Sequence, residues 1–404
     1  MSFASQPDLL GPEAIADPYA VFGTLREEDP VHYSEAHRCW VITRYEDVAD
    51  AFTDPRLSSD RVDAVYATKL TEAERTRRAP TYAVLSDWMV FKDPPDHTRL
   101  RDLVRRAFTP RAVAALEPRI AEVVEHVLDL PEQGEIDVID EIAYPIPAMV
   151  IAEMLGVPPD DRHLFRAWSN DITTLIFQGT RTDADRDRAQ GGLVALSEYL
   201  HGLLAEQRRA PGENLMAALL AARARDDSLS EDEIVNTCVL LLFGGHETTT
   251  NLIANGFLAL LRNPEQAHRL LDEPGLATSA VEELNRYDGP AKMVVRRAAV
   301  DHERAGRRIE AGQRVLLVQC SANRDPRRFE EPDRLDLGRA DQRNVAFGFG
   351  PHYCLGAPLA RLEVQIALPA MLRRLRGAKP AGELRYQPML LTRGLVDFPL
   401  RYGG

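Results

Sequence analysis

Cysteine and long apolar runs are both scarce in this sequence, and each shortage excludes a class of protein. The 404 residues include four cysteines, Cys39, Cys238, Cys320 and Cys354, which lie far apart and form no C-x-x-C pair. A disulfide framework or a zinc site is therefore not expected, and a reducing compartment fits this pattern. No apolar run approaches the roughly 20 residues that span a bilayer, and residues 1–18 lack the basic and apolar segments of a secretion signal. We expect a cytoplasmic protein that does not insert into membranes.

Positive charge is also in short supply. The formal net charge is -13, and only four of the 49 basic residues are lysine. A protein that binds nucleic acid neutralises phosphates with a basic surface, so nucleic acid is not expected as a partner. Internal repeats, low-complexity tracts and Gly/Ser linkers are lacking too, whereas the apolar fraction of 45% is sufficient for a large core.

What the sequence does contain is mostly helical periodicity. Four segments show it clearly, at 110–128, 191–209, 230–262 and 358–375. Strand-like runs are fewer and occur at 31–33, 39–43, 293–300 and 314–319. Helices with a modest amount of strand, and no strand–helix alternation, predict a mainly α fold with a smaller β region. Residues 58–94 and 173–188 lack clear periodicity, so we expect irregular segments there, either lids over a site or plain surface loops.

The segment 230–262 predicts one long helix with an unusual centre. Ser230 and Glu233 form a capping-box pattern at its start, and an Asn-Pro pair at 263–264 stops it. About 32 residues at 1.5 Å each make a helix of roughly 48 Å. Its centre carries a glycine pair at 244–245 and then, after one histidine, an acid and three threonines. The glycines and the threonines weaken a helix. Two explanations remain open: a packing notch against another helix, or a functional site.

The segment 347–356 carries the clearest chemical signal. Gly348, Gly350 and Gly356 surround Cys354 and permit a tight loop whose backbone amides can approach the sulfur atom. A helix is expected directly after this loop, with a proline tolerated in its first turn. Because a helix N-terminus favours a thiolate, the cysteine is suited to bind a metal. The alternative, a small hydrophobic residue of the core, leaves the three glycines without a purpose.

This loop resembles that of the cytochrome P-450 family, in particular its soluble bacterial members. The family pattern F-x-x-G-x-x-x-C-x-G runs through Phe347, Gly350, Cys354 and Gly356. The resemblance extends over nearly the whole chain, and it implies the cytochrome P-450 fold.

Two further motifs strengthen the resemblance. An E-x-x-R pattern is present as Glu283 and Arg286, and the family places a third member, at the position of Arg339, in a buried triad with them. A buried carboxylate between two guanidiniums is costly to break. The centre of the long helix is similar to the family's oxygen-activation segment, where Glu247 and Thr248 would relay protons as the catalytic pair.

The resemblance also implies where the cofactor, haem b, and a substrate would bind. Cys354 would be the axial iron ligand, and Arg297 is preferred to its neighbour Arg296 because the residues that follow then keep the family spacing. The expected haem contacts are His97, Arg101, Arg297, Phe347, Gly348, His352, Cys354 and Gly356. The expected substrate contacts, most of them apolar, are Leu85, Trp88, Met89, Ile176, Phe243, Gly244, Met293, Val294 and Leu391.

The activity implied by the resemblance is that of a haem-thiolate monooxygenase. It would insert one atom of O2 into a hydrophobic or amphipathic small molecule, by hydroxylation or epoxidation. Residues 1–404 would form one haem domain without a fused reductase or ferredoxin module, so the electrons would come from a separate ferredoxin and its NAD(P)H-dependent reductase. Two alternatives remain open, a peroxide-driven peroxygenase and a non-enzymatic haem sensor or electron carrier, although neither needs the acid–alcohol pair.

A cluster of arginines contrasts with the acidic chain as a whole. Its members are Arg99, Arg101, Arg105, Arg106 and Arg111. In the family this region borders the cysteine side of the haem, where an acidic electron donor docks. A local basic patch on a negative protein would steer such a partner.

Overall fold

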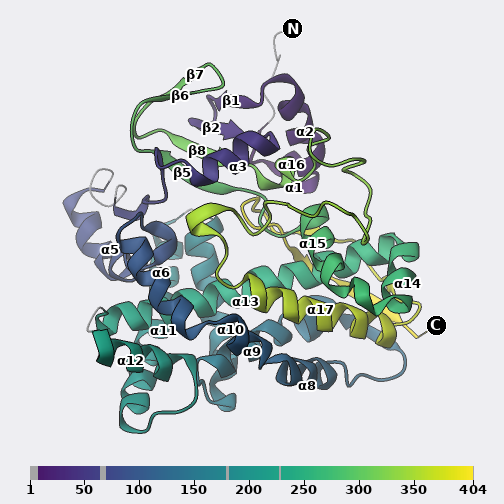
Figure 1. The fold of residues 1–404 in the computed structure, drawn as a ribbon. Coiled ribbons are helices and arrows are strands. Elements are labelled where there is room, and N and C mark those ends of the chain that lie inside the picture. The colour runs from purple at the N-terminus through teal and green to yellow at the C-terminus, as the bar shows by residue number, and fades with distance from the viewer. Residues whose placement is uncertain (1–7, 64–69, 179–181, 227–228, 404) are drawn as a thin grey trace. The chain divides into compact units, whose positions relative to one another are not determined.

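Helices make up most of the protein, as its computed structural model shows for residues 8–63, 70–178, 182–226 and 229–403 (Figure 1). The prediction of a mainly α fold with a smaller β region is confirmed. The chain forms two compact units, the first from residues 1–58, 120–146 and 248–404, and the second from residues 59–119 and 147–247. No helix within the described ranges has an apolar stretch long enough to cross a bilayer.

The helices fall into three groups. Those of the second unit are α5 (Glu72–Leu85), η1 (Met89–Phe91), α6 (Asp96–Ala107), α7 (Pro110–Ala114), η3 (Pro159–Asp161), α10 (Arg162–Thr173), η4 (Thr174–Gln178), α11 (Asp183–Arg209) and α12 (Leu215–Asp226). Three helices have residues in both units: α8 (Glu117–Val127), α9 (Pro145–Met154) and α13 (Glu231–Arg262). Those of the first unit are α1 (Pro12–Ala16), α2 (Pro18–Glu28), α3 (Tyr45–Thr53), η2 (Ile139–Ala143), α14 (Pro264–Asp272), η5 (Pro274–Leu276), α15 (Ala277–Asp288), α16 (Gln319–Ala322), η6 (Gly350–His352) and α17 (Ala357–Arg374).

A five-stranded sheet organises one end of the first unit. Its order is β1 (Val31–Ser34), β2 (Cys39–Ile42), β8 (Arg314–Leu317), β5 (Val294–Ala298) and β3 (Leu57–Ser58), and only the β2–β8 pair is parallel. The strands expected from the sequence are therefore confirmed. Figure 1 shows α3 and α16 beside this sheet. The paired residues Ile42 and Leu317 enter one buried cluster, and Val41 and Leu316 enter another, so both faces of the sheet are covered.

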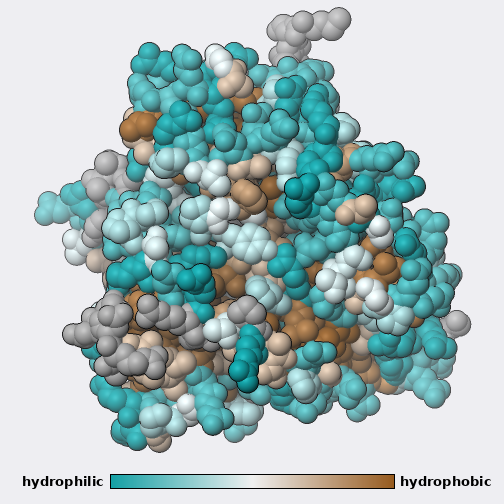
Figure 2. Space-filling model, in the orientation of Figure 1, coloured by the Kyte–Doolittle hydropathy of each residue, from teal (hydrophilic) through white to brown (hydrophobic). Residues whose placement is uncertain are grey.

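The remaining strands are short and lie in the same unit. They are β4 (Gly134–Asp137), β12 (Pro399–Tyr402) and β9 (Lys379–Pro380) in a three-stranded sheet, β10 (Arg385–Tyr386) with β11 (Leu395–Asp397), and the hairpin β6 (His302–Arg304) with β7 (Arg307–Ile309). The molecular surface seen in Figure 2 is mostly hydrophilic, as the charged fraction of 27% leads one to expect.

The long helix α13 begins and ends where the sequence indicated. The backbone N–H of Ser230 donates to Glu233 Oε2 at 2.8 Å, and the backbone N–H of Glu233 donates to Ser230 Oγ at 3.0 Å. This reciprocal pair satisfies two of the N–H groups that a helix start leaves without partners. The helix then continues without a break to Arg262.

Two segments that we expected to be irregular contain helices instead, so that prediction is wrong. Within 58–94, α5 begins after Thr71, whose side chain and that of Glu74 form a capping box. Within 173–188, η4 is helical and α11 begins after Thr182, which forms a capping box with Asp185. Ion pairs and a hydrogen bond join α5 to α11: Arg77 and Arg78 pair with Asp187, and Thr81 donates to Gln190. Hydrophobic periodicity does not detect a helix held in this way.

The helix expected over 110–128 is interrupted, which is a second correction. It forms α7, which ends at Ala114, and α8, which begins at Glu117. Pro118 explains the break, because its ring clashes with the carbonyl four residues earlier and it has no N–H to donate. Proline is tolerated in the first turn of a helix, which is where it lies in α8.

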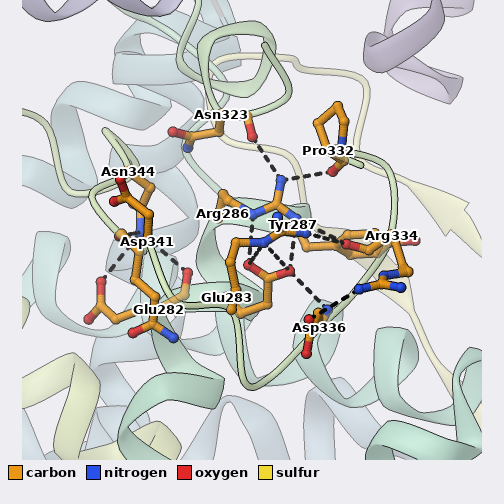
Figure 3. Close-up of polar contacts among 12 residues, drawn as sticks. Glu282, Glu283, Arg286, Tyr287, Asn323, Pro332, Arg334, Asp336, Asp341 and Asn344 are labelled. Atoms are coloured by element: carbon orange, nitrogen blue, oxygen red, sulfur yellow. Dashed lines mark hydrogen bonds and ion pairs between the residues drawn. The ribbon is translucent and has the colours of Figure 1, made fainter. Parts of the chain in front are cut away.

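A buried carboxylate joins three segments of the first unit (Figure 3). The side chain of Glu283 on α15 is fully buried. It accepts hydrogen bonds from Arg286 at 2.7 and 2.8 Å and from Arg339 at 3.1 and 3.2 Å. Arg286 also donates to the backbone carbonyls of Asn323 and Pro332, both at 2.8 Å. We call Glu283, Arg286 and Arg339 the Glu283 triad.

The Glu283 triad predicts a large stability difference between buried and exposed carboxylates. Replacing Glu283 with Gln removes the counter-charge of the buried Arg286 and the partly buried Arg339, and we expect the free energy of unfolding to fall by about 3–5 kcal/mol. The matched control is Glu135→Gln, because Glu135 pairs with Arg401 at an exposed position, where an ion pair contributes about 1 kcal/mol or less. Urea unfolding followed by circular dichroism measures both. Equal losses in the two variants would contradict a structural role for the triad.

Candidate functional site

The loop of residues 347–356, here called the cysteine loop, has a backbone that requires glycine. Gly348 and Gly350 have φ values of 74° and 69°, a region that other L residues rarely adopt. A Cβ atom on Gly350 would also lie 2.7 Å from Cγ2 of Thr53 on α3. The loop closes through the backbone N–H of Cys354, which donates to the carbonyl of Phe347 at 2.9 Å. The glycine spacing noted in the sequence therefore has a conformational cause.

Cys354 differs from the other three cysteines in its surroundings. Its side chain belongs to an exposed residue, whereas Cys39, Cys238 and Cys320 are buried. Burial raises the pKa of Cys238 to about 12 and that of Cys320 to about 11, so both remain protonated thiols at neutral pH. Only Cys354 is therefore accessible for binding a metal as a thiolate.

The position of Cys354 also fits a haem iron. Helix α17 begins at Ala357, as expected, so the sulfur precedes a helix N-terminus by three residues. A Cβ atom on Gly356 would lie 4.0 Å from Sγ of Cys354, so Gly356 lies next to the sulfur. An accessible thiol in a loop built by backbone geometry is the arrangement that an axial ligand needs.

Hydrogen bonds to α16 and the residue after it hold the chain just before the cysteine loop. Gln319 Nε2 donates to the carbonyls of Val345 and Ala346 at 2.6 and 3.1 Å. Asn323 Oδ1 accepts from the backbone N–H of Val345 at 2.9 Å. Sequence reasoning missed Gln319 and Asn323 as supports of this loop, because a lone amide carries no pattern in the sequence.

The predicted propionate ligands lie on both units, and each is described within its own unit. In the second unit, His97 and Arg101 lie one turn apart on α6, with His97 buried and Arg101 half-buried. In the first unit, Arg297 lies on β5 and His352 on η6. Arg296 is buried, with its guanidinium 5.9 Å from the ring centre of Phe52. Since neighbouring strand residues point to opposite faces, Arg297 is directed away from that ring.

The two glycines at the centre of α13 have different environments. A Cβ atom on Gly245 would lie 3.1 Å from Cγ1 of Ile151 on α9, so this glycine is a packing notch. A Cβ atom on Gly244 would meet no atom within 4 Å, and Gly244 is exposed. Packing therefore accounts for Gly245. The functional explanation for the centre of the helix stays a prediction.

The predicted catalytic pair lies in an accessible part of α13. Glu247 and Thr248 are half-buried, whereas their neighbours His246 and Thr249 are buried. Burial lowers the pKa of His246, and its Nδ1 lies 2.7 Å from the carbonyl of Leu242, so this imidazole is neutral and occupied within the helix. The imidazole of His246 is therefore engaged within its own helix, while Glu247 and Thr248 are partly accessible.

Some of the predicted substrate contacts lie together within their units. In the second unit, Trp88 stacks on Phe91 and Phe243 with ring centres 5.9 and 5.8 Å apart. Leu85 ends α5, Met89 begins η1 and Ile176 lies on η4. In the first unit, Met293 is in a buried cluster that Leu391 packs against, and Val294 begins β5.

Comparisons with known proteins agree along the whole chain. Residues 193–385 match the family model described as Cytochrome P450. Cytochrome P450 107B1 of Saccharopolyspora erythraea is 42% identical, with 100% of both chains covered. Vitamin D(3) 25-hydroxylase of Pseudonocardia autotrophica is 41% identical over 98% of this chain and 97% of its own. The structure of P450BioI, solved with an acyl carrier protein that bears hexadec-9Z-enoic acid, superposes with a TM-score of 0.89 at 35% identity, covering 96% of this chain and 100% of its own. The chain therefore belongs to the cytochrome P450 family of haem-binding monooxygenases.

Proposed function

We propose that Cys354 is the axial ligand of the haem iron and that the enzyme oxygenates an apolar small molecule. The observation that carries the proposal is the exposed thiol of Cys354 in a glycine-shaped loop, while the other three cysteines are buried. His97, Arg101, Arg297 and His352 would bind the two propionates as hydrogen-bond donors and cations. When bound, thiolate-ligated haem supplies O2 activation, because the sulfur donates electron density that favours O–O cleavage.

The ligand assignment predicts a spectral difference between two cysteine variants. Reduced wild-type protein exposed to carbon monoxide should show the red-shifted Soret band of sulfur-ligated haem, and Cys354→Ser should not. Cys320→Ala is the control, because Cys320 is a buried thiol with a raised pKa. It should keep the band. A Cys354→Ser variant that retains the band would refute the assignment.

Glu247 and Thr248 are proposed to bring protons to the reaction centre. Consecutive residues of a helix point about 100° apart, so the carboxylate and the hydroxyl are directed to different surroundings. Glu247 can exchange protons with solvent at its carboxylate, while Thr248 holds a proton at Oγ1 and passes it on through water. Both side chains are partly accessible, and their neighbours His246 and Thr249 are buried, which supports this division of roles.

The relay predicts uncoupling when the hydroxyl is removed. In Thr248→Ala we expect O2 consumption to continue while product per O2 falls on the order of tenfold and hydrogen peroxide rises. Thr250→Ala makes the same chemical change on a buried face of α13 and should remain coupled. Oxygen electrode traces, with product and peroxide assayed on the same samples, decide the matter. Tight coupling in Thr248→Ala would remove this residue from the mechanism.

An apolar or amphipathic substrate is proposed from the side chains at the predicted contact positions. Within the second unit these side chains include the stacked rings of Trp88 and Phe243, and within the first unit they include Met293 and Leu391, which share an apolar cluster. Ligand pockets of this composition bind hydrophobic molecules, with a few polar groups to orient them. The relatives named for vitamin D(3) hydroxylation and crystallised with a hexadecenoic acyl chain are consistent with this class.

Electrons are proposed to come from a separate ferredoxin and its NAD(P)H-dependent reductase, in the cytoplasm. The arginine cluster that the sequence suggested as a docking surface is partly neutralised within the second unit. Arg99 pairs with Glu233 and with Asp96, the latter at 3.8 Å, and Arg105 lies 3.3 Å from Asp102. The side chain of Arg106 lies outside the described residues. Arg105 and Arg111 are exposed and therefore the best placed to meet an acidic partner.

Reversing these two charges tests the docking surface. The double variant Arg105→Glu with Arg111→Glu should slow reduction by an acidic ferredoxin by about tenfold at low salt, because like charges then oppose the encounter. The difference should shrink at high salt. Arg376→Glu, an exposed reversal on the first unit, is the control. Stopped-flow reduction rates equal to wild type in the double variant would exclude this surface.

A further inference from the structure

A second carboxylate–arginine pair lies next to the Glu283 triad. Glu282 precedes Glu283 on α15, and because consecutive helical residues point about 100° apart, the two acids serve different partners. Glu283 holds the triad, whereas Glu282 accepts a hydrogen bond from Nε of Arg361 on α17. Asn344 Nδ2 also donates to the backbone carbonyl of Glu282 at 3.3 Å, and Figure 3 shows these two residues beside Glu283.

Arg361 contacts the chain on both sides of Cys354. Its Nη2 donates to the hydroxyl of Tyr353 at 2.9 Å, and its guanidinium lies 4.6 Å from the ring centre of Phe347. Tyr353 directly precedes Cys354, and the carbonyl of Phe347 accepts the hydrogen bond of the Cys354 N–H. A single guanidinium therefore holds the beginning and the end of the turn that presents the thiol.

The positive charge at this position is permanent. Burial lowers the pKa of Arg361, but its hydrogen bonds and charge interactions with Glu282 and Tyr353 together raise the pKa overall. The side chains of Arg361 and Glu282 are 27% and 17% exposed, so solvent screens their fields less than it would on the open surface. The electric field at the thiol then has two opposing contributions, one from the guanidinium of Arg361 and one from the carboxylate of Glu282.

We propose that Arg361 is a positioning residue that sets the reduction potential of the iron held by Cys354, with Glu282 as its opposing charge. The inference rests on the proposed ligand role of Cys354. A fixed cation near the metal stabilises the reduced form, which carries one positive charge fewer, and a fixed anion stabilises the oxidised form. The stacking on Phe347 and the bond to Tyr353 keep the cation at a constant distance from the sulfur.

The two charges predict shifts of opposite sign, which general damage to the loop would not produce. Arg361→Gln should lower the potential and Glu282→Gln should raise it. We expect the ferrous-to-ferric ratio at a fixed potential to change three- to tenfold in each variant, and a tenfold change is 59 mV for a one-electron couple. Spectroelectrochemical titration of the haem-loaded protein measures the ratio, and Arg361→Lys, which keeps the charge but loses the planar fork, should restore much of the potential.

The control is Arg373→Gln, an exposed arginine on the same helix. It lies twelve residues further along, about 18 Å by the helical rise, and beyond the screening length of roughly 8 Å, so its potential should match wild type. Shifts in the same direction for Arg361→Gln and Glu282→Gln, or no more shift in Arg361→Gln than in the control, would overturn the proposal. If Arg361→Gln fails to take up haem, Glu282→Gln alone decides the matter. A reduction potential that falls or stays unchanged in Glu282→Gln would then overturn the proposal. Wild type and each variant are first tested for the carbon monoxide band. Its absence in wild type would refute Cys354 as the ligand, which is a different result from an unexpected shift of the potential.

Discussion

The carboxylate of Glu283, buried between two guanidiniums, is the interaction on which the cysteine loop depends. If Arg286 moved away from Glu283, two buried charges would be separated, which is costly. The same guanidinium binds the carbonyl of Asn323. The side chain of Asn323 in turn holds the backbone of Val345, two residues before the loop begins. The rigidity of an ionic cluster in the core is thus passed through two hydrogen bonds to the segment that presents the thiol. Arg339 closes the carboxylate from the other side, so neither oxygen is left for water.

The cysteine loop then combines two requirements that oppose each other elsewhere in the chain. A metal-binding thiolate must be accessible and near positive potential, whereas Cys238 and Cys320 show that the ordinary surroundings of a cysteine here are apolar and raise its pKa. For Cys354 both requirements are met by Gly348 and Gly350, whose positive φ values turn the chain. The sulfur therefore lies just before the start of α17 and does not enter the core. Backbone conformation, rather than a cluster of polar side chains, creates the ligand position.

Local signals in the sequence were sufficient for the parts of the fold that local forces determine. The capping box at Ser230 and the glycine spacing around Cys354 predicted the start of α13 and the cysteine loop. The same capping logic, had it been applied to Thr71 and Thr182, would have found α5 and the true start of α11. Those helices were missed because an apolar stripe was taken as the main sign of a helix, and α5 packs on α11 through ion pairs instead.

Contacts between distant segments could not be predicted from the sequence, and Arg361 shows why. Its partner Glu282 lies 79 residues away, and the sequence contains 62 acids and 49 basic residues that could form such a pair. Only the fold selects among them. The choice of arginine is nevertheless physical, because a planar guanidinium has edges that bind a carboxylate and a phenol and a face that stacks on Phe347. A lysine ammonium would have no flat face for the ring and no fork for two partners. Because the two acids of α15 are adjacent, the segment that stabilises the core through Glu283 also holds, through Glu282, the guanidinium of Arg361 against the loop.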